Sequence, residues 1–434
     1  MSLLVRIAAV GLALTGPASS QEQTRPEKIA ERMSPYLLVF AGDEDGSQQD
    51  FIAVIDVRPG SPTAGRVVAT RPVGTTASMP HHFEYELPGK ELLLFANSHH
   101  HEETLLVDVG NPLKPQIVKR LRPPPPYRFT HDYKRLPNGN VLVGFLRSEG
   151  ASPRAGDATL PGGHGGIAEY RSDGTLIRTA SAAAANVSEP VRPYALIALL
   201  DRDRILTTSA AMMEESAANV VQIWRYSDFK LLHTIPVPPG RRADGSPVPT
   251  AARAPFAARA MADGSILINT YGCGLYRLTD VTSDRPRVAN IFTFDASEPT
   301  NDSDYRGACA VPLLVDDTYW IMPIGRERRV VTLDLADPSK PREVSRLNMP
   351  HSFAPHWLAR DPRSDRVVLG AHQGGQEGMF ILRLEKKTGR LRFDSLIRSP
   401  SGRVGYIGLT DQKWPHGPTG PAWAHAGLFL ADSK

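Results

Sequence analysis

Three histidines occupy the same position in a recurring segment. His82 opens HFEYELPGKELLLFA, His131 opens HDYKRLPNGNVLVGF and His356 opens HWLARDPRSDRVVLGA, with a proline six residues after each histidine. Neutral imidazole is a common ligand of copper, zinc, iron and nickel. Imidazoles at equivalent positions, with no cysteine in these segments, indicate an open and reactive transition-metal site rather than a closed structural one.

Two more histidines complete the predicted ligand set. His81 directly precedes His82, and neighbours on a strand face opposite sides. We therefore expect one of the pair to bind a metal and the other to pack or to support a ligand. His425 lies on the C-terminal segment AWAHAGLFL. The predicted metal ligands are His81, His82, His131, His356 and His425, and the alternative for any one of them is a strand histidine that hydrogen-bonds in place.

The sequence gives weaker evidence of a functional role for the remaining histidines and for two carboxylates. His99, His100 and His101 form a loop expected on the same face as the cluster, where they either deliver a metal, cover the site or are simply solvated. Asp132 and Glu84 are candidates for orienting a ligand or moving protons, against the alternative of a solvated face. We expect supporting positions for His351 and His416, loop positions for His164 and His372, and an ordinary strand position for His233.

The segments that carry the histidines belong to a repeat. Each is predicted to form a β-hairpin, because apolar residues alternate on both sides of a turn. Three further segments share the layout without the histidine and begin at Tyr194, Phe256 and Cys309, so that successive units are 47 to 63 residues apart. A strand ending in Asp and a proline-containing turn recur after several hairpins, which gives four strands per unit. Four-stranded units of this length indicate a β-propeller.

The chain ends supply a seventh blade. Residues 36–74 hold three strands without a preceding innermost strand, and residues 422–430 form a lone strand. We predict an all-β, seven-bladed β-propeller in which the last strand joins the N-terminal three and closes the ring, because closure removes exposed sheet edges. His82, His131, His356 and His425 then come from four consecutive blades. Two stacked β-sandwiches are the alternative.

Composition agrees with this fold and narrows the function classes. The 434 residues include 36 Gly and 38 Pro, which favours many tight turns over a helix bundle. The formal charge is only +4 and no basic stripe stands out, so we expect no nucleic-acid partner. Two cysteines exclude a disulfide framework and a cysteine-only zinc site.

The N-terminus has the pattern of a secretory signal peptide. One Arg precedes a short apolar run, and Ala18 and Ser20 suit cleavage before Gln21. We assign residues 1–20 to the signal peptide, residues 21–35 to a flexible lead-in and residues 36–434 to one propeller domain. The apolar run is too short for a stable membrane anchor, although an uncleaved anchor is the alternative. A periplasmic or secreted location would allow Cys273 and Cys309 to pair; two separate thiols are the other possibility.

Several stretches resemble the selenium-binding protein family, which includes copper-dependent methanethiol oxidases. They are PHHFEYE at 80–86, THDYKRLPNGNVLV at 130–143, LDLADPSKPR at 333–342 and GPAWAHAGLFL at 420–430. The resemblance implies a seven-bladed propeller that converts methanethiol, oxygen and water into formaldehyde, hydrogen sulfide and hydrogen peroxide. It also implies copper bound by His81, His82, His131 and His425.

Three departures from the family pattern indicate a divergent branch. The cysteine-rich segment that the family associates with selenium is missing, Lys134 replaces a second histidine, and His356 stands where many members have Gln. We expect an exported oxidoreductase that uses copper, or else iron or zinc, to oxidise a small thiol or related small molecule with oxygen. The alternatives are a mononuclear iron oxygenase and a non-enzymatic propeller that binds a metal, peptide or protein. The oligomeric state stays open.

Overall fold

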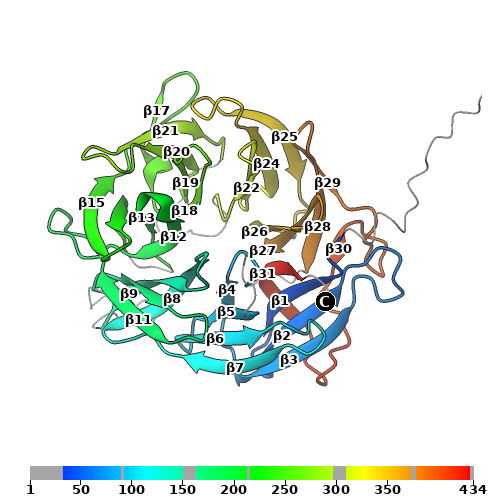
Figure 1. Ribbon diagram of the computed structural model, residues 1–434. Coiled ribbons are helices and arrows are strands. Elements are labelled where there is room, and N and C mark those ends of the chain that lie inside the picture. The colour runs from blue at the N-terminus through cyan, green and yellow to red at the C-terminus, as the bar shows by residue number, and fades with distance from the viewer. Residues whose placement is uncertain are drawn as a thin grey trace, which may run out of the picture.

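The strands form seven blades around a central axis (Figure 1). The computed structural model describes residues 33–88, 92–149, 163–212, 216–296, 309–372 and 378–430. Blade 1 contains β4 (Pro80–Phe83), β5 (Leu93–Ser98), β6 (Glu103–Asp108) and β7 (Gln116–Leu121). Blade 2 contains β8 (Tyr127–Arg135), β9 (Val141–Ser148), β10 (Gly166–Tyr170) and β11 (Leu176–Ser181). Blade 3 contains β12 (Pro193–Leu199), β13 (Arg204–Ser209), β14 (Val220–Arg225) and β15 (Lys230–Pro236).

The next three blades follow the same antiparallel order. Blade 4 contains β18 (Pro255–Ala260), β19 (Ile266–Thr270), β20 (Gly274–Thr279) and β21 (Arg287–Thr293). Blade 5 contains β22 (Leu313–Val315), β23 (Tyr319–Ile324), β24 (Arg329–Asp334) and β25 (Arg342–Asn348). Blade 6 contains β26 (Pro355–Arg360), β27 (Arg366–Ala371), β28 (Met379–Glu385) and β29 (Arg390–Phe393), with β30 (Tyr406–Ile407) paired to β28. A small hairpin, β16 (Gly240–Arg241) and β17 (Pro247–Val248), and two 3₁₀ turns, η1 (Leu200–Arg202) and η2 (Pro249–Ala252), lie between blade strands.

The closing blade joins the two ends of the chain, as the sequence predicts. Its strand order is β3 (Val67–Thr76), β2 (Gln49–Asp56), β1 (Tyr36–Asp43) and β31 (Ala422–Leu430). The C-terminal strand pairs antiparallel with β1, with Leu38 opposite Leu428. The predicted all-β, seven-bladed architecture is therefore confirmed, and the alternative of two stacked sandwiches is wrong.

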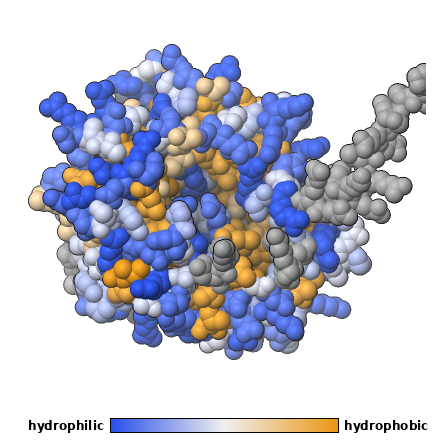
Figure 2. Space-filling view, viewed as in Figure 1, coloured by the Kyte–Doolittle hydropathy of each residue, from blue (hydrophilic) through white to orange (hydrophobic). Residues whose placement is uncertain are grey.

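Apolar side chains fill the interior. On the face drawn in Figure 2, polar residues dominate the periphery. The inner strand β1 is wholly buried, whereas an outer strand such as β11 is mostly exposed. Trp224, Trp320 and Trp357 are among the largest fully buried side chains. Burial of this kind is the main stabilising contribution to such a fold and gives the central strands a rigid frame.

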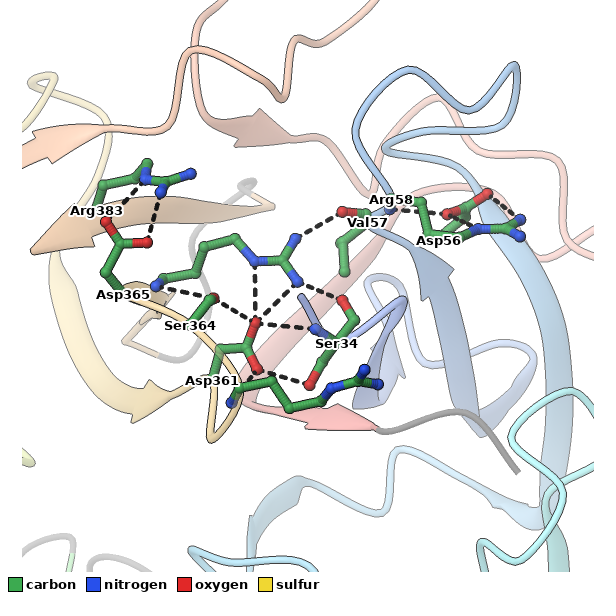
Figure 3. Close-up of polar contacts among 10 residues, drawn as sticks. Ser34, Asp56, Val57, Arg58, Asp361, Ser364, Asp365 and Arg383 are labelled. Carbon is green, nitrogen blue, oxygen red and sulfur yellow. Dashed lines mark hydrogen bonds and ion pairs between the residues drawn. The ribbon is translucent and has the colours of Figure 1, made fainter. Parts of the chain in front are cut away.

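A buried ion pair fastens the start of the propeller to blade 6 (Figure 3). The Arg366 guanidinium contacts Asp361 at 2.9 Å and donates to the Val57 carbonyl oxygen at 2.6 Å. The Ser34 hydroxyl donates to Asp361 at 2.6 Å, and Ser34 is fully buried. Met33 and Ser34, which precede the predicted domain boundary at residue 36, are thus buried, and the hydroxyl and N–H of Ser34 supply hydrogen-bond donors to Asp361.

The predicted signal peptide, residues 1–20, and residues 21–32 of the predicted lead-in lie outside the described residues. Within the described ranges, no helix is both long and apolar enough to cross a membrane. Cys273 and Cys309 form a disulfide, so of the two possibilities left open by the sequence the structure has the paired one.

Candidate metal centre

The innermost strands share an irregularity that places the histidines. In β4, Pro80 pairs with Ser98 but Phe83 pairs with Ala96, so one extra residue interrupts the register. The same one-residue shift follows Pro355 in β26, Pro193 in β12 and Pro255 in β18. A bulge of this kind re-aims side chains that regular alternation would send to opposite faces.

The bulge brings both members of the His81–His82 pair into one cluster. Their rings are stacked with centroids 4.0 Å apart. Regular alternation would send the two side chains to opposite faces, but the extra residue between Pro80 and Phe83 breaks that alternation. That one of the pair binds a metal while the other packs or supports a ligand stays a prediction.

All five predicted ligands meet in this cluster, although they come from four blades. The ring centroids of His82 and His131 are 4.6 Å apart, and those of His356 and His425 are 4.4 Å apart. His81 and His425 connect the two pairs at 4.2 Å. All five are buried; the most exposed, His356, is only 4% exposed.

The ring nitrogens are close enough to share metal ions. One nitrogen each from His81, His82 and His131 lie within 4.8 Å of one another, and so do those of His82, His356 and His425. His82, His131, His356 and His425 each carry a buried ring nitrogen without a hydrogen-bond partner. Buried nitrogens of this kind are suited to coordination, so the residues present fit a transition metal.

Burial keeps these imidazoles neutral. It lowers the pKa of His81, His82, His356 and His425 well below 6.5, and the neighbouring imidazoles lower it further. Burial also lowers the pKa of His131 to about 3, although its hydrogen bond to the backbone of Tyr194 opposes the shift. Neutral imidazole is the form that binds metals.

Asn97 supports two of the predicted ligands from β5. Its side-chain oxygen accepts a hydrogen bond from the backbone N–H of His82 at 2.7 Å. Its amide nitrogen donates to the carbonyl oxygens of Thr130 and His131 at 3.1 and 3.0 Å. Asn97 thereby ties the bulge of blade 1 to that of blade 2, which fixes the relative positions of the two rings.

Gly370 in blade 6 also helps to position a predicted ligand. It lies on β27 opposite Trp357, just after the bulge that holds His356. A methyl group at residue 370 would overlap the carbonyl oxygen of His425. The glycine therefore lets the strand that carries His425 approach β27 closely.

The structure adds two histidines that the sequence did not assign to the cluster. His99 is buried, with its ring 4.1 Å from that of His81, and His372 lies 5.0 Å from His356. They occupy equivalent positions: the N–H of His99 donates to the Met79 carbonyl and that of His372 to the Ala354 carbonyl. Each follows the residue that pairs with the proline before the bulge. The sequence does not show that pairing, so it carried no signal that would place these two rings in the cluster.

The other histidines lie apart from the cluster. His100 and His101 are exposed on the loop beside His99, with ring nitrogens near the carbonyl oxygens of Ala77 and Thr76. His416 hydrogen-bonds Thr70 and Thr419, His351 is exposed, His164 accepts from the Val191 N–H, and His233 lies on β15.

The two candidate carboxylates differ. Glu84 forms a bidentate ion pair with Arg135, with both contacts at 2.6 Å, and therefore serves the fold rather than a proton path. Asp132 accepts a hydrogen bond from the Leu196 N–H at 2.8 Å, and its other oxygen is buried without a partner. Burial raises the pKa of Asp132 to about 7, which the Leu196 N–H and Arg259 oppose.

Aromatic rings lie against one side of the cluster. Trp357 lies 5.0 Å from the ring of His82, and Tyr85 stacks on Trp357 at 4.6 Å. Tyr194 lies 3.7 Å from the ring of His131. These rings shield the imidazoles from water.

Solved structures share this fold at low sequence identity. No protein-family model and no curated protein sequence matches the chain. A hypothetical selenium-binding protein from Sulfolobus tokodaii superposes with a TM-score of 0.67 at 15% identity, over 94% of this chain and 97% of that one. A periplasmic gluconolactonase from Pseudomonas aeruginosa gives a TM-score of 0.56 at 15% identity, over 82% and 93% of the two chains.

A putative 6-phosphogluconolactonase from Bacteroides uniformis is also similar, with a TM-score of 0.55 at 12% identity over 86% of this chain and 97% of that one. These neighbours include both a selenium-binding protein and lactonases, and their sequence identity to this chain is low, so the likeness shows the shared fold alone. The function of this chain must therefore be argued from the histidine cluster.

Proposed function

We propose that this protein is an exported, copper-dependent oxidoreductase that oxidises a small thiol or a related small reduced molecule with oxygen. One observation carries the proposal: neutral imidazoles from four blades converge in a buried cluster without a thiolate. A site built only from imidazoles suits copper, and also iron or zinc. The resemblance to the selenium-binding protein family favours copper.

The chain supplies ligands, orientation and a dry environment. His82, His131, His356 and His425 would supply ligands, since each offers a buried nitrogen without a partner. The hydrogen bond from Asn97 and the close approach at Gly370 hold the strands that carry these rings. Bound copper would supply one-electron redox chemistry.

The sulfur chemistry would come from the substrate. Cys273 and Cys309 are joined in a disulfide, so the protein itself supplies no thiolate ligand. A small thiol that reached the cluster would lie against Trp357 and Tyr194, whose apolar faces suit a short alkyl group. Asp132, next to His131, is the nearby carboxyl available to take up a proton.

Export is part of the proposal and has two supports. Residues 1–20 have the charged, apolar and small-residue regions of a secretory signal peptide. The Cys273–Cys309 disulfide suits an oxidising compartment such as the periplasm. Detection of the mature protein in a periplasmic fraction, with an N-terminus at Gln21, would test both; an uncleaved protein in the membrane fraction would contradict the proposal.

The experiment that tests the function compares the wild type with a His82→Ala/His131→Ala double variant after export. We expect the wild type to contain copper and to release hydrogen peroxide when a small thiol and oxygen are added. The double variant should lose both properties, whereas His416→Ala should keep both because His416 lies outside the cluster. Equal metal contents in the wild type and the double variant would contradict the proposal.

A second candidate function is a metal carrier without turnover. The exposed His100 and His101 favour it, because they lie on the surface next to the buried His99 and offer a route for a metal ion. A carrier would bind copper and transfer it to a chelator or partner, but would release no peroxide with thiol and oxygen. The same assay therefore distinguishes the two functions.

A further inference from the structure

We propose that the cluster holds two metal ions per chain, with His82 between them. This inference rests on the metal site of the proposed function but goes beyond it in the number of ions. The two ions would occupy the two groups of ring nitrogens described above, which share His82 and no other residue.

The seven imidazoles divide into two triads on either side of His82. The first triad belongs to blades 1 and 2: the ring of His81 lies 4.1 Å from that of His99 and 5.4 Å from that of His131. The second belongs to blade 6 and the closing blade and consists of His356, His372 and His425, with centroid distances from 4.4 to 6.4 Å. Two members of each triad form a nitrogen group with His82, so His82 completes both three-nitrogen sites.

His82 is suited to the position between the triads. Its ring lies 4.6 Å from that of His131 on one side and 5.4 Å from that of His425 on the other. Both of its ring nitrogens are buried and lack a hydrogen-bond partner. An imidazole has two nitrogens on opposite edges of its ring, so one nitrogen can bind each ion.

A single ion would leave part of the cluster unexplained. A four-coordinate ion binds four nitrogens. Yet His99, His131, His356 and His425, in addition to His82, each bury at least one ring nitrogen without a partner. Polar groups in a protein interior are normally paired, and a second ion would pair those that the first cannot reach.

The charge of the site is compatible with two cations. The described ligands are all neutral imidazoles, so two ions would be costly to bury without an anionic group. When both nitrogens of His82 bind, its ring proton leaves to solvent and the ring becomes an anion. That negative charge lies between the two ions and offsets part of their repulsion.

Zinc stoichiometry tests the inference without depending on activity. The exported full-length protein is stripped with a chelator, loaded with excess Zn²⁺, desalted, and its zinc content per chain measured by mass spectrometry. We expect two ions in the wild type, one in His356→Ala, one in His81→Ala and two in the control His416→Ala. The zinc content of the wild type tests the two-ion inference even if a variant fails to fold.

The outcomes separate this inference from the proposed function. One zinc ion in the wild type would overturn the two-ion inference and leave the metal site intact, whereas none would overturn the metal site itself. Loading with two equivalents of Cu²⁺ adds a second readout. Ions joined through His82 should give a spin-coupled electron paramagnetic resonance spectrum, and a spectrum of two independent ions at full intensity would contradict the bridge.

Discussion

The Nδ1 atom of His131 donates a hydrogen bond of 2.8 Å to the backbone carbonyl oxygen of Tyr194. A carbonyl oxygen only accepts, so this bond fixes the tautomer of His131 and leaves Nε2 as its ligand atom. Tyr194 occupies the bulge of blade 3, as His131 occupies that of blade 2. The orientation of the ligand therefore depends on the backbone of the neighbouring blade.

Replacing Asn97 should weaken both the fold and the metal site. Asn97→Ala removes the side-chain partner of the His82 N–H and of two buried carbonyl oxygens, which costs about 1–3 kcal/mol of unfolding free energy. Metal affinity should fall about 10- to 100-fold because the ligand strands are less well held. Chemical unfolding and metal competition with a chelator measure the two effects.

Asn269→Ala is the matched control for this change. Asn269 is buried on β19 and donates to the Ala310 carbonyl, far from the cluster in sequence and in a different blade. It should lower stability without changing metal affinity. If both variants weakened metal binding equally, the role of Asn97 in positioning the ligands would be disproved.

Acid should destabilise the metal-free protein through its buried imidazoles. Burial holds the pKa of His131 near 3 in the folded state, against 6.5 for an unperturbed imidazole. Between these values the unfolded state binds more protons, so the stability present above pH 6.5 is lost as the pH falls, by at most about 1.4 kcal/mol per pH unit for each such group.

Urea unfolding of the metal-free protein at pH 7, 6 and 5 measures this loss. His131→Gln should give a shallower dependence on pH, since it removes one of the buried imidazoles. An unfolding free energy that is constant between pH 7 and pH 5 would show that the imidazoles are not held neutral by burial.

Adding one methyl group at Gly370 should displace His425. The Cβ atom of Gly370→Ala would overlap the His425 carbonyl oxygen and also approach Met379. We expect a loss of about 1–3 kcal/mol in unfolding free energy, together with weaker metal binding. The control is Gly408→Ala, whose Cβ would lie 3.4 Å from the Tyr406 ring, an ordinary contact. Unchanged metal affinity in Gly370→Ala would argue against His425 as a ligand.

The ion pair that fastens the closing blade to blade 6 should contribute strongly to stability. Arg366→Ala leaves Asp361 buried without its cation and should cost about 3–5 kcal/mol. Arg383→Ala breaks the neighbouring, partly exposed pair with Asp365 and should cost about 0–1 kcal/mol (Figure 3). Thermal and urea unfolding compare the two variants, and equal losses would contradict this difference.

The fold was predictable because its repeat can be recognised directly in the amino-acid sequence. Hairpins beginning near His82, His131 and His356 recur with alternating apolar residues, and the unpaired strands at the two ends require each other. Strand number and closure follow from that count. Nothing in the alternation of residues 80–83 shows that β4 contains a bulge, and this is why the sequence could not show that both His81 and His82 lie in the cluster.

The candidate site could be predicted only for those histidines whose position on a strand of the repeat places them in the cluster. His99 and His372 follow the second strand of a hairpin, and their place in the cluster depends on which residue pairs with Pro80 or Pro355. That register is set by packing between strands, so the sequence left both as loop residues. The Cys273–Cys309 disulfide likewise joins two positions whose proximity depends on adjacent blades.

X-ray absorption at the copper edge of the loaded, exported protein tests the central claim most directly. Ligation by His82, His131, His356 and His425 predicts a first shell of nitrogen atoms and the outer-shell pattern of imidazole rings, with no sulfur in the absence of substrate. A first shell containing protein sulfur, or one without the imidazole pattern, would contradict the claim that these blades converge on a metal.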